Sequence, residues 1–151
     1  MTEEFVTRTL LTWLRFRSWN ILSFDYPHSG TGYVLRPISI ASQMSKNVGN
    51  LIPDIVANKN GITVIFENKV SFFSEDIEAL FLMKDSKVYD SAIQNLHGNT
   101  TYSELRVGVG LASLPKNIVE LHRHKSSLDF AFVIHADRKV EVVFDQRLIF
   151  T

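Results

Sequence analysis

Apolar side chains recur at helical spacing in three segments of the chain. In residues 3–17 they return every three or four positions, which predicts a helix with Thr2 as its N-cap. A second helical pattern covers residues 74–96 and allows a kink on the way. A third begins with Pro115, a residue favoured in the first turn, and covers residues 115–121. We therefore expect two long helices and one short one.

Short runs rich in β-branched and aromatic residues lie between these helices and predict strands. The runs are residues 21–26, 52–58, 62–70, 105–112, 128–134 and 140–144. Asn60 and Gly61 separate the second and third runs, and this pair is the strongest short signal for a β-hairpin. Residues 27–50, rich in Ser, Gly and Asn, predict a loop or lid with one short strand near 33–38.

The order of these elements predicts the fold class. A helix, three strands, a helix and a strand are followed by a helix and a β-hairpin, which we expect to form an appendage. The class is α/β, with a central mixed β-sheet flanked by helices. Because no repeat, low-complexity run or boundary interrupts the 151 residues, we expect a single domain over residues 1–151.

Composition narrows the classes of protein. Without cysteine, the chain has no disulfide and no thiolate zinc site, so oxygen and imidazole are the remaining metal ligands. Sixteen basic and sixteen acidic residues give a net charge of zero, without the global positive field of many nucleic-acid binders. No run approaches the roughly 20 apolar residues that cross a bilayer, and no secretory signal is visible. We expect no membrane association and a cytoplasmic location.

The hairpin brings two carboxylates together. If residues 60–61 form a two-residue loop, Lys59 faces Ile62 across the hairpin. Counting outward in that register then places Asp54 opposite Glu67. Carboxylates about 5 Å apart repel by about 3 kcal/mol at an effective dielectric near 20. The pair therefore requires a proton or a cation, and a divalent metal is its natural partner.

Strand alternation adds an amine to this pair. Lys69 is two residues beyond Glu67 and points to the same face of the strand. The opposite face is apolar and can pack on a helix; it carries Ile55, Ala57, Ile62, Val64 and Phe66. One or two carboxylates and phosphate oxygens suffice to bind Mg²⁺, which can assist phosphodiester hydrolysis. Lys69 would position and acidify the attacking water, or neutralise the transition state.

These residues resemble a known signature. Pro53-Asp54 followed by Glu67-Asn68-Lys69 is similar to the PD-(D/E)xK motif of restriction endonucleases, Holliday-junction resolvases and many repair nucleases. The resemblance covers residues 3–112, where the order of elements also agrees. It implies a restriction endonuclease-like core (α-β-β-β-α-β) and Mg²⁺-dependent endonuclease activity on nucleic acid, most often DNA, with Mn²⁺ as a substitute. It also implies that Asp54, Glu67 and the Asn68 carbonyl bind the metal, and that Lys69 is catalytic.

The resemblance suggests further features. Some family members add a glutamate from the first helix, and Glu3 and Glu4 are both candidates. Glu3 lies nearer the apolar stripe and is favoured, although first-turn glutamates also stabilise helices without any role in a site. Small members commonly cut two strands as homodimers, so a homodimer is expected, although no sequence feature shows an interface.

Six polar side chains are weaker candidates for contacts with nucleic acid. Two lie in the loop before the hairpin, one at its turn, one late in the second helix and two in the basic run 122–125. They are Arg36, Lys46, Lys59, Gln94, Arg123 and Lys125. Ordinary solvated side chains explain such residues equally well.

The sequence is also compatible with other functions. The substrate of the same fold could be RNA, a branched junction or a single strand. A nuclease fold can also serve as a binding or assembly subunit without turnover. A chance motif in an unrelated α/β protein would place Asp54 and Glu67 on separate surfaces.

Overall fold

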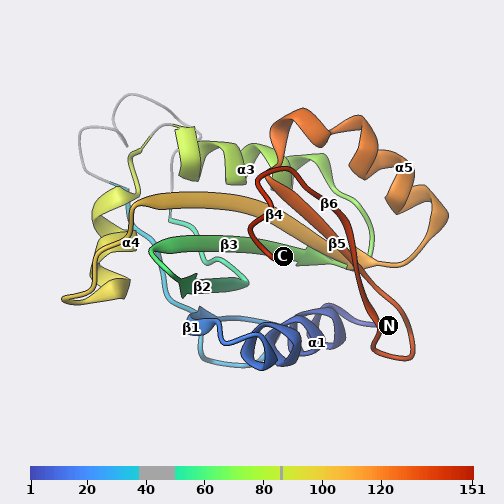
Figure 1. Cartoon of the computed structure of the whole chain (residues 1–151), viewed down its shortest axis with the longest axis horizontal. Coiled ribbons are helices and arrows are strands. Elements are labelled where there is room, and N and C mark those ends of the chain that lie inside the picture. Colours follow the sequence, from blue (N-terminus) through green and yellow to red (C-terminus); the bar gives the residue numbers. More distant parts are fainter. Residues whose placement is uncertain (38–49, 86) are drawn as a thin grey trace.

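The chain folds around a six-stranded mixed sheet (Figure 1). The computed structural model describes residues 1–37, 50–85 and 87–151. The strands follow one another across the sheet in chain order: β1 (Asn20–Phe24), β2 (Ile55–Lys59), β3 (Ile62–Lys69), β4 (Glu104–Ala112), β5 (Phe130–Ile134) and β6 (Val140–Asp145). β4 runs parallel to both β3 and β5, and the other neighbours are antiparallel. The predicted α/β class with a central mixed sheet is confirmed.

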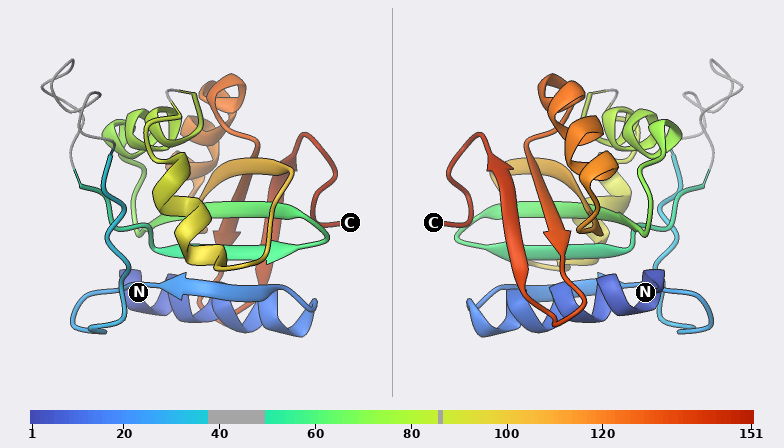
Figure 2. Two further views of the ribbon diagram at one scale, coloured as in Figure 1. Left: turned by 90° about the vertical axis from the view of Figure 1, so that its left-hand side faces the viewer. Right: turned by 90° about the vertical axis from the view of Figure 1, so that its right-hand side faces the viewer.

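Helices cover both faces of this sheet (Figure 2). α1 (Glu3–Phe16) lies on one face, and α3 (Ser74–Asp85), α4 (Asp90–His97) and α5 (Pro115–Arg123) contribute to the core on the other. A short 3-10 helix, η1 (Lys125–Ser127), follows α5. Within the described ranges, no helix combines the length and the apolar character that a bilayer crossing requires.

The first helix begins where the sequence predicts. The Thr2 hydroxyl accepts a hydrogen bond from the Phe5 N–H at 3.1 Å, which caps the helix. Val6, Leu10 and Leu14 are fully buried against β2, β3 and β5. This packing fixes α1 on the sheet with its N-terminus near the end of β3.

The hairpin of β2 and β3 has the predicted register. Asn60 and Gly61 have φ angles of 52° and 80°, as a two-residue turn between twisted strands requires. Lys59 pairs with Ile62, and the ladder continues in step to Ile55 and Phe66. The residues predicted to be apolar and inward-facing pack on the α1 side.

Two predicted segments differ from the structure. The helical pattern of residues 74–96 is two helices, because α3 ends at Asp85 and Lys87, with φ 59°, adopts a left-handed conformation that ends helical geometry. In the loop before the hairpin, the described residues form one isolated bridge between Leu35 and Leu51 rather than a strand. Residues 38–49 lie outside the described part.

The expected C-terminal appendage is wrong, because β5 and β6 belong to the central sheet. The chain leaves β4, passes through α5 and returns as β5 parallel to β4. All five residues of β5 (Phe130–Ile134) are buried. An uninterrupted apolar run is typical of a strand covered on both faces, which an appendage does not offer.

Two glycines of β4 make room for close neighbours in α1 and β5. A Cβ at Gly110 would overlap Leu10 of α1 and would lie 2.7 Å from Oδ1 of Asn68. A Cβ at Gly108 would overlap Phe130. Both positions therefore require glycine for lack of space.

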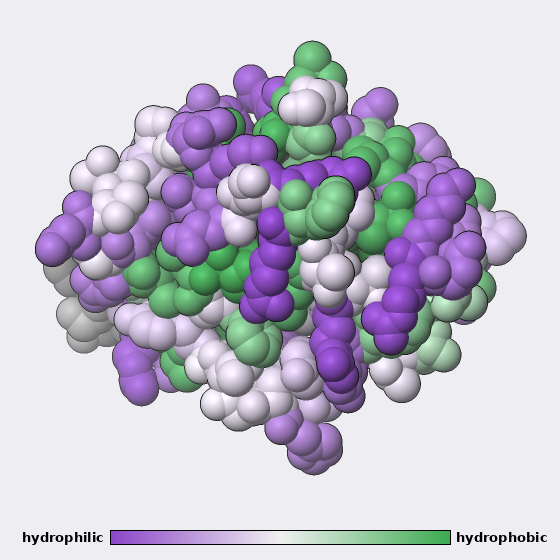
Figure 3. All heavy atoms as spheres, turned by 60° about the horizontal axis from the view of Figure 1, so that its bottom comes forward, coloured by the Kyte–Doolittle hydropathy of each residue, from purple (hydrophilic) through white to green (hydrophobic). Residues whose placement is uncertain are grey.

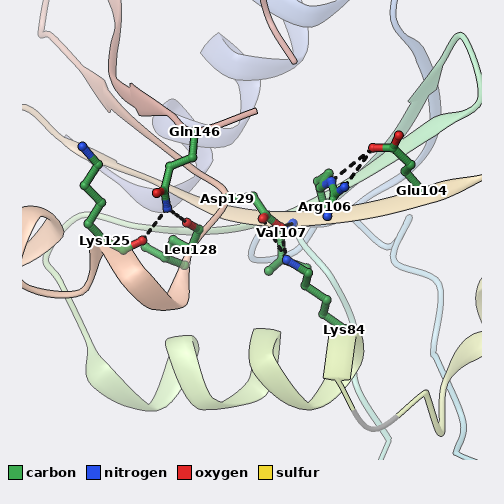
Figure 4. A network of polar contacts seen from close by, with 8 residues as sticks. All are labelled: Lys84, Glu104, Arg106, Val107, Lys125, Leu128, Asp129 and Gln146. Carbon is green, nitrogen blue, oxygen red and sulfur yellow. Dashed lines mark hydrogen bonds and ion pairs between the residues drawn. The ribbon is translucent and has the colours of Figure 1, made fainter. Parts of the chain in front are cut away.

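A buried ion pair ties α3 to the sheet (Figure 4). Lys84 Nζ lies 2.8 Å from both carboxylate oxygens of Asp129, and the Val107 N–H donates to the same carboxylate at 3.0 Å. This network lies away from the hairpin acids and has a structural role.

Candidate active site

Asp54 and Glu67 lie opposite each other at one end of the hairpin. Asp54 immediately precedes β2, and its N–H donates to the Phe66 carbonyl at 3.2 Å. Because Phe66 already pairs with Ile55, this bond places Asp54 at an irregularity where the regular ladder ends. The two carboxyl groups are close enough for the charge of Asp54 to act on Glu67, so the two acids lie on one surface and not on two.

Both acids hold protons more tightly than isolated carboxyl groups. Burial raises the pKa of Asp54 to about 7 against the lowering influence of the Asn68 N–H and of Lys69. Burial and then the charge of Asp54 raise the pKa of Glu67 well above its usual value. The predicted repulsion is therefore present, and one proton or one cation between the two oxygens relieves it.

Lys69 stands beside the acids and reaches the first helix. Its Nζ lies 3.1 Å from Oε1 of Glu3, and both side chains are about one-third exposed. Burial lowers the pKa of Lys69, but the hydrogen bond and the charge of Glu3 outweigh it and raise the pKa overall. Glu4 instead pairs with Arg8 at 3.2 Å on the exposed side of α1. Of the two glutamates, the structure brings only Glu3 to Lys69.

Asn68 connects the acid pair to α1. Its N–H donates to Oδ2 of Asp54 at 2.7 Å, and its side-chain amide donates to the Thr7 hydroxyl at 3.1 Å. Since the N–H and the carbonyl of one strand residue point to the same side, the Asn68 carbonyl also points toward Asp54. The buried amide holds α1 against β3 one turn after Glu3.

The sequence reasoning missed two further acids near the site. Asp76, in the first turn of α3, raises the pKa of Glu67 and of Lys69 through its charge. Asp25, just after β1, adds to the rise in the pKa of Asp54. Asp76 follows β3 by only seven positions, and a helix that starts there must open beside Lys69. That short connection was the signal that could have identified it.

The donor set fits a hard divalent cation. Asp54 and Glu67 offer carboxylate oxygens whose mutual repulsion a cation removes, and hard cations prefer oxygen. Across the described ranges, no three His, Cys, Asp or Glu side chains converge into a preformed metal cage. Mg²⁺ usually keeps several waters and binds through one or two protein carboxylates.

Two of the weaker candidates lie at the other end of the sheet. Lys59 Nζ donates to the Arg17 carbonyl at 2.7 Å, and five residues of strand, about 17 Å, separate it from Asp54. Gln94 donates to the Thr100 carbonyl at 2.9 Å in the connection after α4. Neither side chain belongs to the acid site.

The remaining candidates are dispersed. Arg123 pairs with Glu120 at 2.9 Å, and Lys125 lies 5.5 Å from the Phe144 ring centroid. Arg123 is the last residue of α5 and Lys125 follows it, so the nine residues of α5, about 13 Å, separate them along the chain from the end of β4. Arg36 is exposed beside the isolated bridge, and Lys46 lies outside the described residues.

The site is thus assembled from three elements at one end of the sheet. The hairpin supplies the acid pair and the amine, α1 supplies Glu3, and α3 supplies Asp76. Protein-family models, curated proteins and solved structures were each compared with this chain, and none of them matches it.

Proposed function

We propose that this protein is a Mg²⁺-dependent nuclease of the PD-(D/E)xK type, with a restriction endonuclease-like core, that hydrolyses phosphodiester bonds of nucleic acid, most often DNA. The observation that carries the proposal is the close, buried pair of Asp54 and Glu67 at the end of the β2–β3 hairpin. Lys69 on the same strand face completes the set. Two buried carboxylates side by side repel each other and destabilise the folded chain. Cation binding is a function that explains why such a pair is present.

The acid pair would hold the metal. Asp54 and Glu67 supply carboxylate oxygens, and the Asn68 carbonyl, which points to the same side as its N–H, supplies a backbone oxygen. The bound Mg²⁺ or Mn²⁺ would polarise the phosphate and lower the pKa of bound water. The Asn68 N–H keeps the Asp54 carboxylate oriented through the bond at 2.7 Å.

Lys69 would position the attacking water and place positive charge near the phosphate. An ammonium group has three donors, and Glu3 occupies one of them at 3.1 Å. Two donors therefore remain for water or for a phosphate oxygen. Glu3 keeps the amine charged, because it raises the pKa of Lys69.

The test is cleavage of a set of substrates. Plasmid, linear duplex, four-way junction and RNA are incubated with the protein and Mg²⁺ or Mn²⁺, beside Asp54→Asn and Lys69→Ala. Asp85→Asn, on the exposed end of α3, is the matched carboxylate control. We expect metal-dependent cleavage that both site variants abolish and the control retains.

Two outcomes contradict the proposal. Cleavage that survives both site substitutions identifies a contaminating nuclease. Metal-independent binding without cleavage of any substrate identifies a binding or assembly subunit of the same fold. The cleaved substrate also separates DNA from RNA and from junctions.

A further inference from the structure

A groove lies between α1 and the start of β6, apart from the acid pair. Its volume is about 280 Å³, and its lining includes Thr9, Trp13, Phe16, Arg17, Arg138 and Val140. Among the described residues, no carboxylate lines it. The view onto the α1 side shows apolar areas between polar side chains on this face (Figure 3). The groove is therefore apolar with positive charge at its ends.

The two arginines of the groove stack on aromatic rings. The Arg17 guanidinium lies 3.9 Å from the Trp13 ring centroid, and that of Arg138 lies 4.8 Å from the Phe5 centroid. Stacking occupies the face of a guanidinium and leaves the N–H donors on its edge available. Neither arginine forms an ion pair with a described residue. Both are thus preorganised to bind an anion.

The spacing of the arginines suits a polyanion. Phe5 and Trp13 are eight residues apart on one helix, or about 12 Å along its axis. Phosphates of one strand follow at about 3.4 Å along the axis of a duplex, so roughly three phosphates span this interval. A single small anion would leave one arginine without a partner.

An exposed aromatic ring lies at the Arg17 end of the groove. Phe16 is 87% exposed and lines the groove, whereas the half-buried Trp13 ring packs against Arg17, Phe132 and Phe150. An exposed flat ring beside a cation is a platform on which an unpaired base stacks. A duplex hides the faces of its bases, so this ring favours a single strand.

The groove lies along the helix that carries Glu3. On α1 its lining begins at Thr9, six residues after Glu3, or about 9 Å along the helix axis. Arg138 lies over Phe5, near the start of the same helix. The groove and the contact of Glu3 with Lys69 are therefore within reach of one bound strand.

We propose that this groove binds a single-stranded segment of nucleic acid next to the scissile bond. Arg138 and Arg17 bind phosphates, and Phe16 stacks on a base. The inference rests on the proposed function for its link to the site. It adds the form of the substrate, a single strand or a duplex with a single-stranded extension.

The test is binding in EDTA, where no cleavage occurs. Fluorescence anisotropy is measured with a labelled 12-nucleotide oligo-dT and with a 12-base-pair duplex at two salt concentrations. The variants are Arg17→Ala, Arg138→Ala and Phe16→Ala. Arg8→Ala, an exposed arginine of the same helix paired with Glu4, is the matched control. Circular dichroism confirms that each variant is folded.

We expect the single strand to bind more tightly than the duplex. Each groove arginine removed should weaken binding by about tenfold and reduce the salt slope by about 0.7. Phe16→Ala should weaken binding by about tenfold or more, and Arg8→Ala should leave it unchanged. Equal binding by all variants, or equal binding of both oligonucleotides, overturns the inference. The inference is also overturned if oligonucleotide binding does not depend on Phe16, whereas self-association or binding to anionic vesicles does.

Cleavage assays separate this inference from the proposed function. If the protein cleaves nucleic acid and the groove variants keep the wild-type KM, the groove inference fails and the nuclease stands. If no substrate is cleaved but the oligonucleotide binds as expected, the nuclease proposal fails and the groove stands. If both hold, the groove variants raise KM more than they lower kcat.

Discussion

Lys69 Nζ lies 3.1 Å from Oε1 of Glu3, a contact that joins the end of β3 to the first turn of α1. The side chains are 35% and 36% exposed, so the pair is open to solvent and to a ligand. Burial of Lys69 disfavours its charge, and Glu3 more than compensates. In the proposed function, Glu3 would therefore act as a positioning residue that keeps Lys69 charged beside the acid pair.

Replacing Glu3 should impair catalysis more than folding. Glu3→Gln removes the charge that raises the pKa of Lys69, so that pKa falls. Loss of a charged hydrogen bond costs about 1.5–3 kcal/mol, which predicts a loss of cleavage of roughly ten- to hundredfold. The pH–rate profile should also lose activity at a lower alkaline pH than in the wild type.

The control for this change lies at the next position. Glu4→Gln breaks only the exposed pair with Arg8, and a pair of that kind contributes about 0.3–0.5 kcal/mol. Its rate and pH profile should match those of the wild type. Equal losses in both variants would show that the first-turn charge, and not the contact with Lys69, matters.

The acid pair should make the metal-free protein less stable as pH rises. Burial first, then like charges, raises the folded pKa of Asp54 to about 7, so the folded chain binds this proton more tightly than the unfolded chain. The stabilisation is complete below the unfolded pKa of about 3.9 and is lost as pH rises through about 7. Its size is on the order of 3 kcal/mol. Denaturant unfolding in EDTA from pH 4.5 to 8.5 measures it.

Asp54→Asn should flatten this profile. The amide oxygen can still accept the Asn68 N–H, but it carries no charge beside Glu67. The variant should therefore be more stable than the wild type at pH 8, with a smaller difference at pH 4.5. Asp85→Asn, exposed on α3, should keep the wild-type slope. A variant less stable than the wild type at pH 8 contradicts the repulsion.

A divalent metal should reverse the same destabilisation. At 100 times its Kd, Mg²⁺ or Mn²⁺ stabilises by about 2.7 kcal/mol, or about 5–10 °C in Tm for a chain of this size. At pH 5 the shift should nearly vanish, because protons compete for Asp54 and Glu67. Thermal scans at both pH values measure it, and Asp54→Asn should show no shift at either. A shift retained by that variant would place the metal elsewhere.

The sequence sufficed to predict the acid pair because one turn determines its register. Asn60 and Gly61 adopt positive φ angles that few other residues tolerate, so the loop length and the pairing of Lys59 with Ile62 follow. From that point, alternation carries the ladder to Ile55 and Phe66, and Asp54 follows at the irregular end of the ladder, beside Glu67. Local chemistry was enough for this part of the site.

Long-range arrangement could not be predicted in the same way. Asp76 reaches the site only because α3 folds back beside β3. In the sequence, an acid that only stabilises the first turn of a helix looks the same as an acid that also belongs to a site. Arg138 reaches α1 only because the β5–β6 hairpin belongs to the sheet. The basic run 122–125 was a weaker candidate and Arg138 was none, since charge density is visible in a sequence and proximity is not.

The ion pair between Lys84 and Asp129 should contribute strongly to stability. Asp129→Ala leaves the Lys84 ammonium and the Val107 N–H without their acceptor. Removing one partner of a buried pair costs about 3–5 kcal/mol. Lys84 is 32% exposed, so water offsets part of this, and we expect about 2–3 kcal/mol by denaturant unfolding.

The neighbouring pair in Figure 4 is the control. Arg106 and Glu104 form a partly exposed pair at 3.0 Å, and Arg106→Ala should cost about 1 kcal/mol or less. In the double variant Lys84→Met with Asp129→Ala, the total loss should be smaller than the sum of the single losses. Additive losses would show that the two side chains do not interact.

Asp76 can be separated from an ordinary first-turn acid by comparison with Glu75. Each lies in the first turn of α3, where an acid stabilises the helix by about 0.3–1 kcal/mol, so Asp76→Asn and Glu75→Gln both lose that contribution. Only Asp76→Asn also removes a charge that raises the pKa of Glu67, after burial and Asp54. In EDTA, NMR titration of the Glu67 carboxyl should therefore give a lower pKa in Asp76→Asn than in the wild type, and an unchanged pKa in Glu75→Gln. An unchanged pKa of Glu67 in both variants would show that Asp76 serves the helix and not the acid site.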